Sequence, residues 1–165
     1  LGIDIILFDA EDNGDNGGTS ETMFTWCLGA QHWAKNKHVK GYRADYGILL
    51  DMVGSKGARF AKDNISMKYA APHMNKFWQL AQAMGKGNFF VNEPTTIGID
   101  DHYIVNTVAM IPMFDIINKP KDSSTGFGLY WHTHDDNMDV IDKNTLQAVG
   151  QVLLAALYRE NNGTY

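Results

Sequence analysis

The stretch IILFDAED, residues 5–12, decides the fold of this chain. Its apolar residues extend a run that begins two positions earlier, and the polar loop NGDNGG follows at residues 13–18. An apolar run between turn residues predicts a strand over residues 3–9 that is buried on both faces. Open α/β sheets place their chemistry at the carboxyl ends of such strands. The adjacent acids Glu11 and Asp12 therefore predict a site in which one acid binds a metal and the other transfers protons, although a solvated acidic strand end has the same pattern.

The composition bounds the size of the protein and the partners it can have. The 165 residues are 44% hydrophobic and 20% charged, which is typical of a globular chain of at most one domain. The net charge of -5 gives no support for nucleic acid or an anionic membrane as a partner. No apolar stretch approaches the ~20 residues of a membrane span. The single cysteine, Cys27, excludes a disulfide within the chain.

Strand-like and helix-like patterns alternate along the chain. A strand buried on both faces needs neighbours on both edges, so the early position of the first strand predicts that the chain is part of a larger domain. The alternation predicts a mainly parallel sheet with helices on both faces. Trp26, Trp33 and Trp78 fall at helical positions and are expected in the core, whereas residues 60–69 favour neither a helix nor a strand. Strands are predicted over residues 3–9, 46–53 and 111–117, and helices over 24–36, 74–84, 102–109 and from Asp142 to near Asn161.

Further acids and histidines follow the other predicted elements. Asp51 closes the second strand, the triplet DDH occupies residues 100–102, and WHTHDDN occupies residues 131–137. Asp, Glu and His are zinc ligands, and catalytic zinc sites use three protein ligands and an open position. Ligands from separate strand ends converge in α/β folds. The local signatures HExxH and CxxC are absent, as are phosphate-binding glycine loops and the GxSxG elbow.

Four motifs occur in the order seen in one enzyme family. They are FDAED at residues 8–12, LLDMVG at 49–54, DDH at 100–102 and WHTHDDN at 131–137. On these motifs the chain resembles the glutaminyl cyclases (glutaminyl-peptide cyclotransferases), which are related in fold to the co-catalytic zinc aminopeptidases. Its Glu-Asp pair, where animal enzymes tend to have Glu-Glu, is similar to the bacterial branch.

The resemblance implies a fold, a cofactor and a location. The fold is a three-layer α/β sandwich with a mostly parallel central sheet flanked by helices. Residues 1–165 would be the C-terminal portion of a single zinc-dependent cyclotransferase/exopeptidase domain. One Zn²⁺ is expected in each chain, and the family suggests an extracytoplasmic protein of the periplasm or cell envelope.

The resemblance also implies roles for individual residues. Asp12 and His132 match zinc ligands, and a further aspartate ligand is expected upstream of Leu1. Glu11 matches the general acid/base. The remaining matches are Asp51 and Asp100 as acids of a hydrogen-bond network around that glutamate, Trp131 as an aromatic lining of the substrate pocket, and Asp115 at a position where animal members carry histidine. His102 is expected to cap or orient the two aspartates before it.

The expected reaction closes the N-terminal glutamine of a peptide or protein to pyroglutamate and releases ammonia. Zinc polarises the side-chain carbonyl, and Glu11 moves the proton from the α-amine to the leaving nitrogen. A zinc aminopeptidase is the alternative, with Asp51 on a second zinc and Glu11 activating water. A third hypothesis is a non-catalytic binding module that kept the fold. The oligomeric state stays open.

Overall fold

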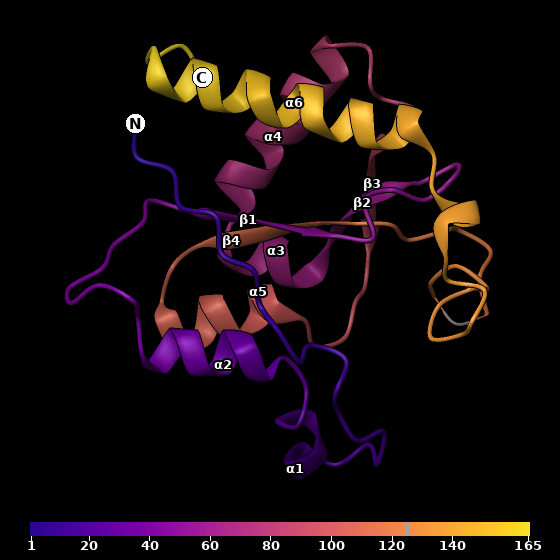
Figure 1. Ribbon diagram of the computed structural model, residues 1–165. Helices are drawn as coiled ribbons and strands as arrows, with labels where there is room; N and C mark the ends of the chain where they lie inside the picture. The colour runs from indigo at the N-terminus through magenta and orange to yellow at the C-terminus, as the bar shows by residue number, and fades with distance from the viewer. Residues whose placement is uncertain (125) are drawn as a thin grey trace.

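Two pairs of parallel strands form the centre of the structure (Figure 1). The structure is a computed structural model that describes residues 1–124 and 126–165. β1 (Gly47–Asp51) pairs with β4 (Met113–Ile117), and β2 (Phe60–Asp63) pairs with β3 (Phe90–Thr95). An antiparallel bridge from the first residue of β2 to Asn118 connects β2 to the end of β4. The parallel pairing confirms the kind of sheet predicted from the alternation of strands and helices.

Helices cover both faces of the β1–β4 pair and so make three layers (Figure 1). α4 (Ala71–Ala83) and α6 (Lys143–Asn161) lie on one side, and α2 (Leu28–Lys35) and α5 (Asp101–Ile104) lie on the other. A separate apolar cluster fills each side, so the β1–β4 sheet is packed on both faces. The first cluster includes Phe77, Trp78, Phe114 and Val152, and the second includes Cys27, Ala30, Ile104 and Met113. The three-layer α/β architecture expected for the family is confirmed.

Side-chain caps explain where several helices begin. The carboxylate of Asp63 accepts hydrogen bonds from the backbone N–H groups of Ile65 and Ser66 in the first turn of α3 (Asn64–Tyr69), and Asp142 caps α6 as expected from the sequence. Residues 60–69, which favoured neither element, therefore divide at Asp63 into β2 and α3. The remaining short elements are α1 (Ser20–Met23), α3 (Asn64–Tyr69), the π-helical turn η1 (Val105–Ala109) and the 3-10 turn η2 (Met138–Val140).

The N-terminal segment is the main departure from prediction. Residues 1–10 form no strand, and none of the described strands pairs with them. The predicted strand over residues 3–9 is therefore wrong. Ile5 and Leu7 are 86% and 89% exposed, whereas the alternate residues Ile6 and Phe8 are half-buried against the protein. An apolar run measures the tendency to be buried, but a strand also needs a hydrogen-bonded neighbour, which the pattern itself cannot supply.

Two helices also begin or continue differently from prediction. The helix predicted over residues 24–36 begins only at Leu28, because Cys27 has a left-handed backbone. The helix predicted over residues 102–109 begins at Asp101 and widens into η1. No helix in the described ranges combines the length and the apolar character needed to cross a membrane.

Candidate active site and metal centre

The segment that carries Glu11 and Asp12 is fastened to the start of α2. Backbone N–H groups of residues 27–29 donate to the carbonyl oxygens of residues 9–11 at 3.0–3.2 Å. The first N–H groups of a helix have no partner within the helix, so they are available for this contact. A Cβ atom on Gly29 would lie 2.4 Å from the carbonyl oxygen of Asp9, so only glycine allows the approach. The helix thereby fixes the position of both acids.

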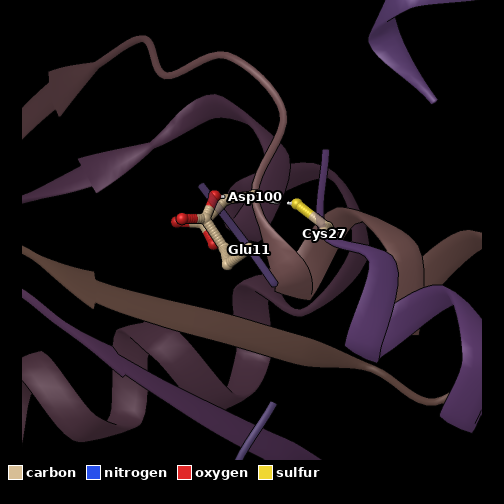
Figure 2. A group of neighbouring side chains, drawn as sticks. All are labelled: Glu11, Cys27 and Asp100. Atoms are coloured by element: carbon tan, nitrogen blue, oxygen red, sulfur yellow. Dashed lines mark hydrogen bonds between the residues drawn. The ribbon is translucent and has the colours of Figure 1, made fainter. Parts of the chain in front are cut away.

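Glu11 meets acids from two other parts of the chain. Asp51 is the last residue of β1, and Asp100 is the N-cap of α5. Figure 2 shows the carboxyl groups of Glu11 and Asp100 close together, with the sulfur of Cys27 directed toward them. One ligand-type atom from each of these three residues lies within 4.8 Å of the others, and Cys27 Sγ is 3.8 Å from Glu11 Oε1. The fold thus brings together the acids that the sequence placed at separate strand ends.

The surroundings of Glu11 raise its pKa from 4.5 to about 8. Burial has the largest effect, because it disfavours the charged form. A hydrogen bond with Asp12 comes next, and the negative charges of Asp100, Asp12 and Asp51 add to it. A carboxyl group that titrates near neutral pH can both accept and return a proton, as a general acid/base must.

The neighbouring acids are perturbed in the same direction. Burial, followed by the charges of Asp100 and Asp12, raises the pKa of Asp51 to about 7. Burial and Asp100 also raise the pKa of Asp101 to about 7. In the part of the chain that the structure describes, the lysine and arginine ion pairs are made with Glu93 and Glu160 instead. These acids therefore hold protons or need a bound cation.

Asp12 and His132 lie side by side although 120 positions separate them in the sequence. His132 Nε2 is 2.9 Å from Asp12 Oδ1, and the two side chains are 33% and 72% exposed. The imidazole also lies against Trp131, with ring centres 3.8 Å apart, and against Trp26, with ring centres 6.3 Å apart. The site therefore has an accessible carboxylate–imidazole pair bordered by two indoles.

The chemistry of this pair fits zinc. Carboxylate oxygen and imidazole nitrogen are usual zinc ligands, and two ligands on one tetrahedral zinc lie about 3.3 Å apart. The 2.9 Å separation of Asp12 Oδ1 and His132 Nε2 is close to that value. The two residues can therefore serve as two of the three protein ligands of a catalytic zinc.

Trp26 is a site residue that the sequence did not reveal. It was expected in the core, but it lies half-buried in the turn before α2, and its Nε1–H donates to the carbonyl oxygen of Asp15 at 3.3 Å. Its indole covers Gly14, where an added Cβ would be 2.0 Å from the ring. The indole also lines a hollow of about 280 Å³, together with Asp15, Asn16, Gly18, Thr19, Thr22, Met23 and Ile99. By contrast, Trp78 is fully buried, as predicted.

A second group of polar residues lies fully buried behind Asp100. His102 Nε2 is 3.4 Å from Asp63 Oδ1, and His102 Nδ1 is 4.0 Å from Asp115 Oδ2. Burial tends to raise the pKa of Asp63, but hydrogen bonds from His102 and Ser66 outweigh it and lower the pKa. Burial and the charge of Asp100 raise the pKa of Asp115 well above its ordinary value. No motif pointed to Asp63, which lies in the segment that favoured neither a helix nor a strand.

Strained backbone is concentrated around these side chains. Ala10, Cys27, Met52 and His132 have φ angles of 51°, 56°, 50° and 58°, in the left-handed region that favours glycine. Each is a site residue or directly adjoins Glu11 or Asp51 along the chain or across a hydrogen bond. Such strain persists where the surrounding structure fixes a side chain for function.

Comparison with known proteins places the chain in a family. The model of peptidase family M28 matches residues 1–157. The chain belongs to peptidase family M28. This M28 chain is similar to solved bacterial structures. It is 44% identical to the glutaminyl cyclase of Porphyromonas gingivalis, with a TM-score of 0.86 over 92% of this chain and 51% of that one.

Two further relatives show the range of the M28 similarity. A Zn-dependent exopeptidase from Parabacteroides distasonis is 49% identical, with a TM-score of 0.87 over 92% of this chain and 52% of that one. The glutaminyl-peptide cyclotransferase of Drosophila melanogaster is 25% identical over an alignment of 171 positions that covers 93% of this chain and 45% of the relative. The resemblance to bacterial glutaminyl cyclases with a zinc exopeptidase-like fold is confirmed. The M28 chain spans about half the length of the relatives it matches.

Proposed function

We propose that the protein is a zinc-dependent glutaminyl-peptide cyclotransferase. The observation that carries the proposal is Glu11, whose pKa is raised to about 8 and which adjoins the Asp12–His132 pair. The similarity to the glutaminyl cyclase of Porphyromonas gingivalis supports the same reaction. The substrate would be a peptide or protein with N-terminal glutamine.

Glu11 is suited to move the proton that the reaction requires. An N-terminal α-amino group has a pKa of ~7.7–8.0, so proton transfer to a carboxylate with a pKa of about 8 is nearly balanced. The freed amine attacks the side-chain carbonyl carbon and forms the new C–N bond of the five-membered lactam. The protonated Glu11 then donates to the leaving nitrogen, the old C–N bond breaks and ammonia departs. The lactam nitrogen gives its surplus proton to the Glu11 carboxylate. When bound at Asp12 and His132, zinc would polarise the reacting carbonyl as a Lewis acid.

The other site residues would support this step in different ways. Asp100 and Asp51 keep the proton affinity of Glu11 high through their charges. The indoles of Trp131 and Trp26 border the metal pair and would hold the apolar part of the substrate. The proposal therefore gives Glu11 the chemical role and its neighbours positioning roles.

The decisive experiment compares the complete, zinc-loaded protein with two variants on a short peptide that begins with glutamine. Ammonia release and product mass are read together, and cyclisation gives a product ~17 Da lighter, the mass of ammonia lost in the lactam chemistry. We expect Glu11→Gln to keep its zinc and lose at least about 100-fold in kcat, because it cannot carry a proton. The exposed His134→Gln is the control. Full activity of Glu11→Gln would contradict the assignment.

A zinc aminopeptidase is the second candidate, and the similarity to the exopeptidase of Parabacteroides distasonis favours it. In that reaction Glu11 would activate water and Asp51 would bind a second zinc. The same assay would then release free glutamine and a shortened peptide without ammonia.

A further inference from the structure

Hydrogen bonds within residues 128–133, the His132 turn, give the segment around His132 a tight, strained shape. The carbonyl oxygen of Tyr130 accepts from the N–H of Thr133 at 3.0 Å and from the hydroxyl of Thr133 at 2.6 Å. The φ angle of 58° at His132 lies in the left-handed region, and such strain persists only where the surroundings hold it. These bonds shape the turn, but they do not fix where it lies relative to the sheet.

The hydroxyl of Tyr130 connects the His132 turn to the sheet. Tyr130 Oη is 2.5 Å from Ser55 Oγ, and it accepts a hydrogen bond from the side-chain amide of Asn118 at 3.4 Å. Among the described residues, the other hydrogen bond from the turn to a distant segment is the contact of His132 with Asp12. Zinc held by those two residues would take the place of that contact. The Tyr130 hydroxyl would then be the remaining hydrogen-bonded connection of the turn.

Both partners of the Tyr130 hydroxyl are themselves held in place. Ser55 is buried in the segment after β1, and its carbonyl oxygen accepts from the buried hydroxyl of Thr145 in α6 at 2.9 Å. Asn118 is buried directly after β4, and its Oδ1 accepts from the backbone N–H of Arg59 at 2.9 Å. Because that oxygen is engaged, the amide N–H group of Asn118 is the one that faces Tyr130. The hydroxyl therefore meets two fixed partners at the carboxyl ends of β1 and β4.

The packing around Tyr130 transmits its position to the site. An added Cβ on Gly128 would lie 2.3 Å from the Tyr130 ring, so glycine allows this ring to pack back over the turn. Trp131 and His132 follow Tyr130 directly in the chain, and their rings stack with centres 3.8 Å apart. A shift of Tyr130 would therefore displace the indole and the imidazole together.

We propose that Tyr130 is a positioning residue for the zinc ligand His132. Its hydroxyl fastens the His132 turn to Ser55 and Asn118, and the turn then holds the imidazole at ligand distance from Asp12. Removing a group that orients a metal ligand from behind typically costs about 10–100-fold in metal affinity. The Tyr130 hydroxyl is engaged with the protein itself, so no step of the reaction is assigned to it. The inference rests on the proposed zinc-dependent function, but its first readout is zinc affinity and not turnover.

The first test measures the zinc dissociation constant of the complete protein and three variants. We expect Tyr130→Phe, which removes only the hydroxyl, to raise that constant about 10-fold. Ser55→Ala should have the same effect, because it removes the other half of the same hydrogen bond. The control is Tyr158→Phe, which changes an exposed tyrosine of α6 and should leave zinc affinity unchanged. An unchanged dissociation constant in Tyr130→Phe would overturn the proposal.

The second test combines Tyr130→Phe and Ser55→Ala in one complete protein. The double variant should bind zinc no more weakly than either single variant, because the two changes remove one shared bond. Effects that add would overturn the proposal, since the two hydroxyls would then act separately.

The third test follows turnover of a glutamine-initiated peptide with zinc in excess. Tyr130→Phe should then recover most of its activity, because Glu11 is intact. Turnover that stays low with zinc bound would overturn the positioning role. An unmodified protein that binds zinc and forms no pyroglutamate would contradict only the proposed function.

Discussion

Glu11 holds its proton to a higher pH than an exposed glutamate because it is half-buried among acids. In the described residues, no lysine or arginine forms an ion pair with it. Part of this effect comes from charges that a single substitution can remove. Asp51 is one of the acids whose charge raises the pKa of Glu11. The proposed reaction needs the deprotonated Glu11, so we expect the rate to fall as the pH drops below the pKa of this group.

Asp51→Asn should therefore move the acidic limb of the pH–rate profile to lower pH. Removing a neighbouring negative charge lowers the pKa of Glu11, and we expect a shift of roughly half to one pH unit. The measurement is kcat/KM for a glutamine-initiated peptide between pH 5 and 9. A limb that stays in place would show that Asp51 does not influence Glu11.

Individual residues differ in how well the sequence predicted them. Glu11, Asp12 and His132 carry recognisable motifs, and the structure brings them together. Trp26 has the same spacing as a helical core residue, and only the left-handed Cys27 after it places the indole in a turn. Asp63 and His102 become neighbours because α3 and α5 both pack against β4, which no local pattern encodes.

At the scale of elements, α2 holds the segment that carries Glu11 and Asp12 in place. Its first N–H groups bind the carbonyl oxygens of residues 9–11, and Gly29 leaves the room for this contact. This contact is made by backbone atoms, so a methyl group added at Gly29 can disrupt it without changing any acidic side chain.

Gly29→Ala should lift the loop from α2. An overpacked contact of this kind destabilises by about 1–3 kcal/mol, and we expect a large loss of kcat because Glu11 moves. The matched control is Gly150→Ala in α6, where nothing lies within 4 Å of an added Cβ. That change should stabilise the full-length protein by roughly 0.5–1 kcal/mol and keep full activity. Thermal unfolding and activity are measured for both, and equal behaviour of the two variants would rule out this role of α2.

The elements that the sequence predicted well are those with local signals. Asp142 caps α6, and the strands near residues 47–51 and 113–117 have compact apolar runs. The segment 3–9 has an equally apolar run, yet it forms no strand. The difference lies in hydrogen bonding: its last residues bond to α2, and none of the described strands pairs with the rest.

For the whole molecule, the buried acids make stability depend on pH. Burial raises the pKa of Asp51 and Asp101 to about 7 and that of Asp115 well above its ordinary value. A raised pKa means that the folded state keeps its proton more tightly than the unfolded chain. The protonated acids therefore favour the folded state at low pH. For Asp51 this contribution is lost as the pH rises from its ordinary pKa of 3.8 through its raised pKa of about 7.

The metal-free, full-length protein should therefore unfold at a higher temperature at pH 5 than at pH 8. Asp115→Asn removes one of these acids with little change in shape, so it should raise the Tm of the metal-free protein at pH 8 by roughly 3–6 °C. At pH 5 the gain should be smaller. Scanning calorimetry at both pH values checks the prediction, and a variant that is destabilised equally at both would contradict it.

Cys27 lies under Glu11 with no exposed surface, and burial raises the pKa of its thiol. Thiol reagents attack the thiolate, so this cysteine can be labelled only when the loop above it lifts away. The rate at which a maleimide modifies Cys27, followed by mass spectrometry of its peptide, therefore reports how often the segment above Cys27 opens in the folded protein. A ligand that holds this segment against α2 would lower the labelling rate of Cys27, so ligands could be screened without any assay of turnover.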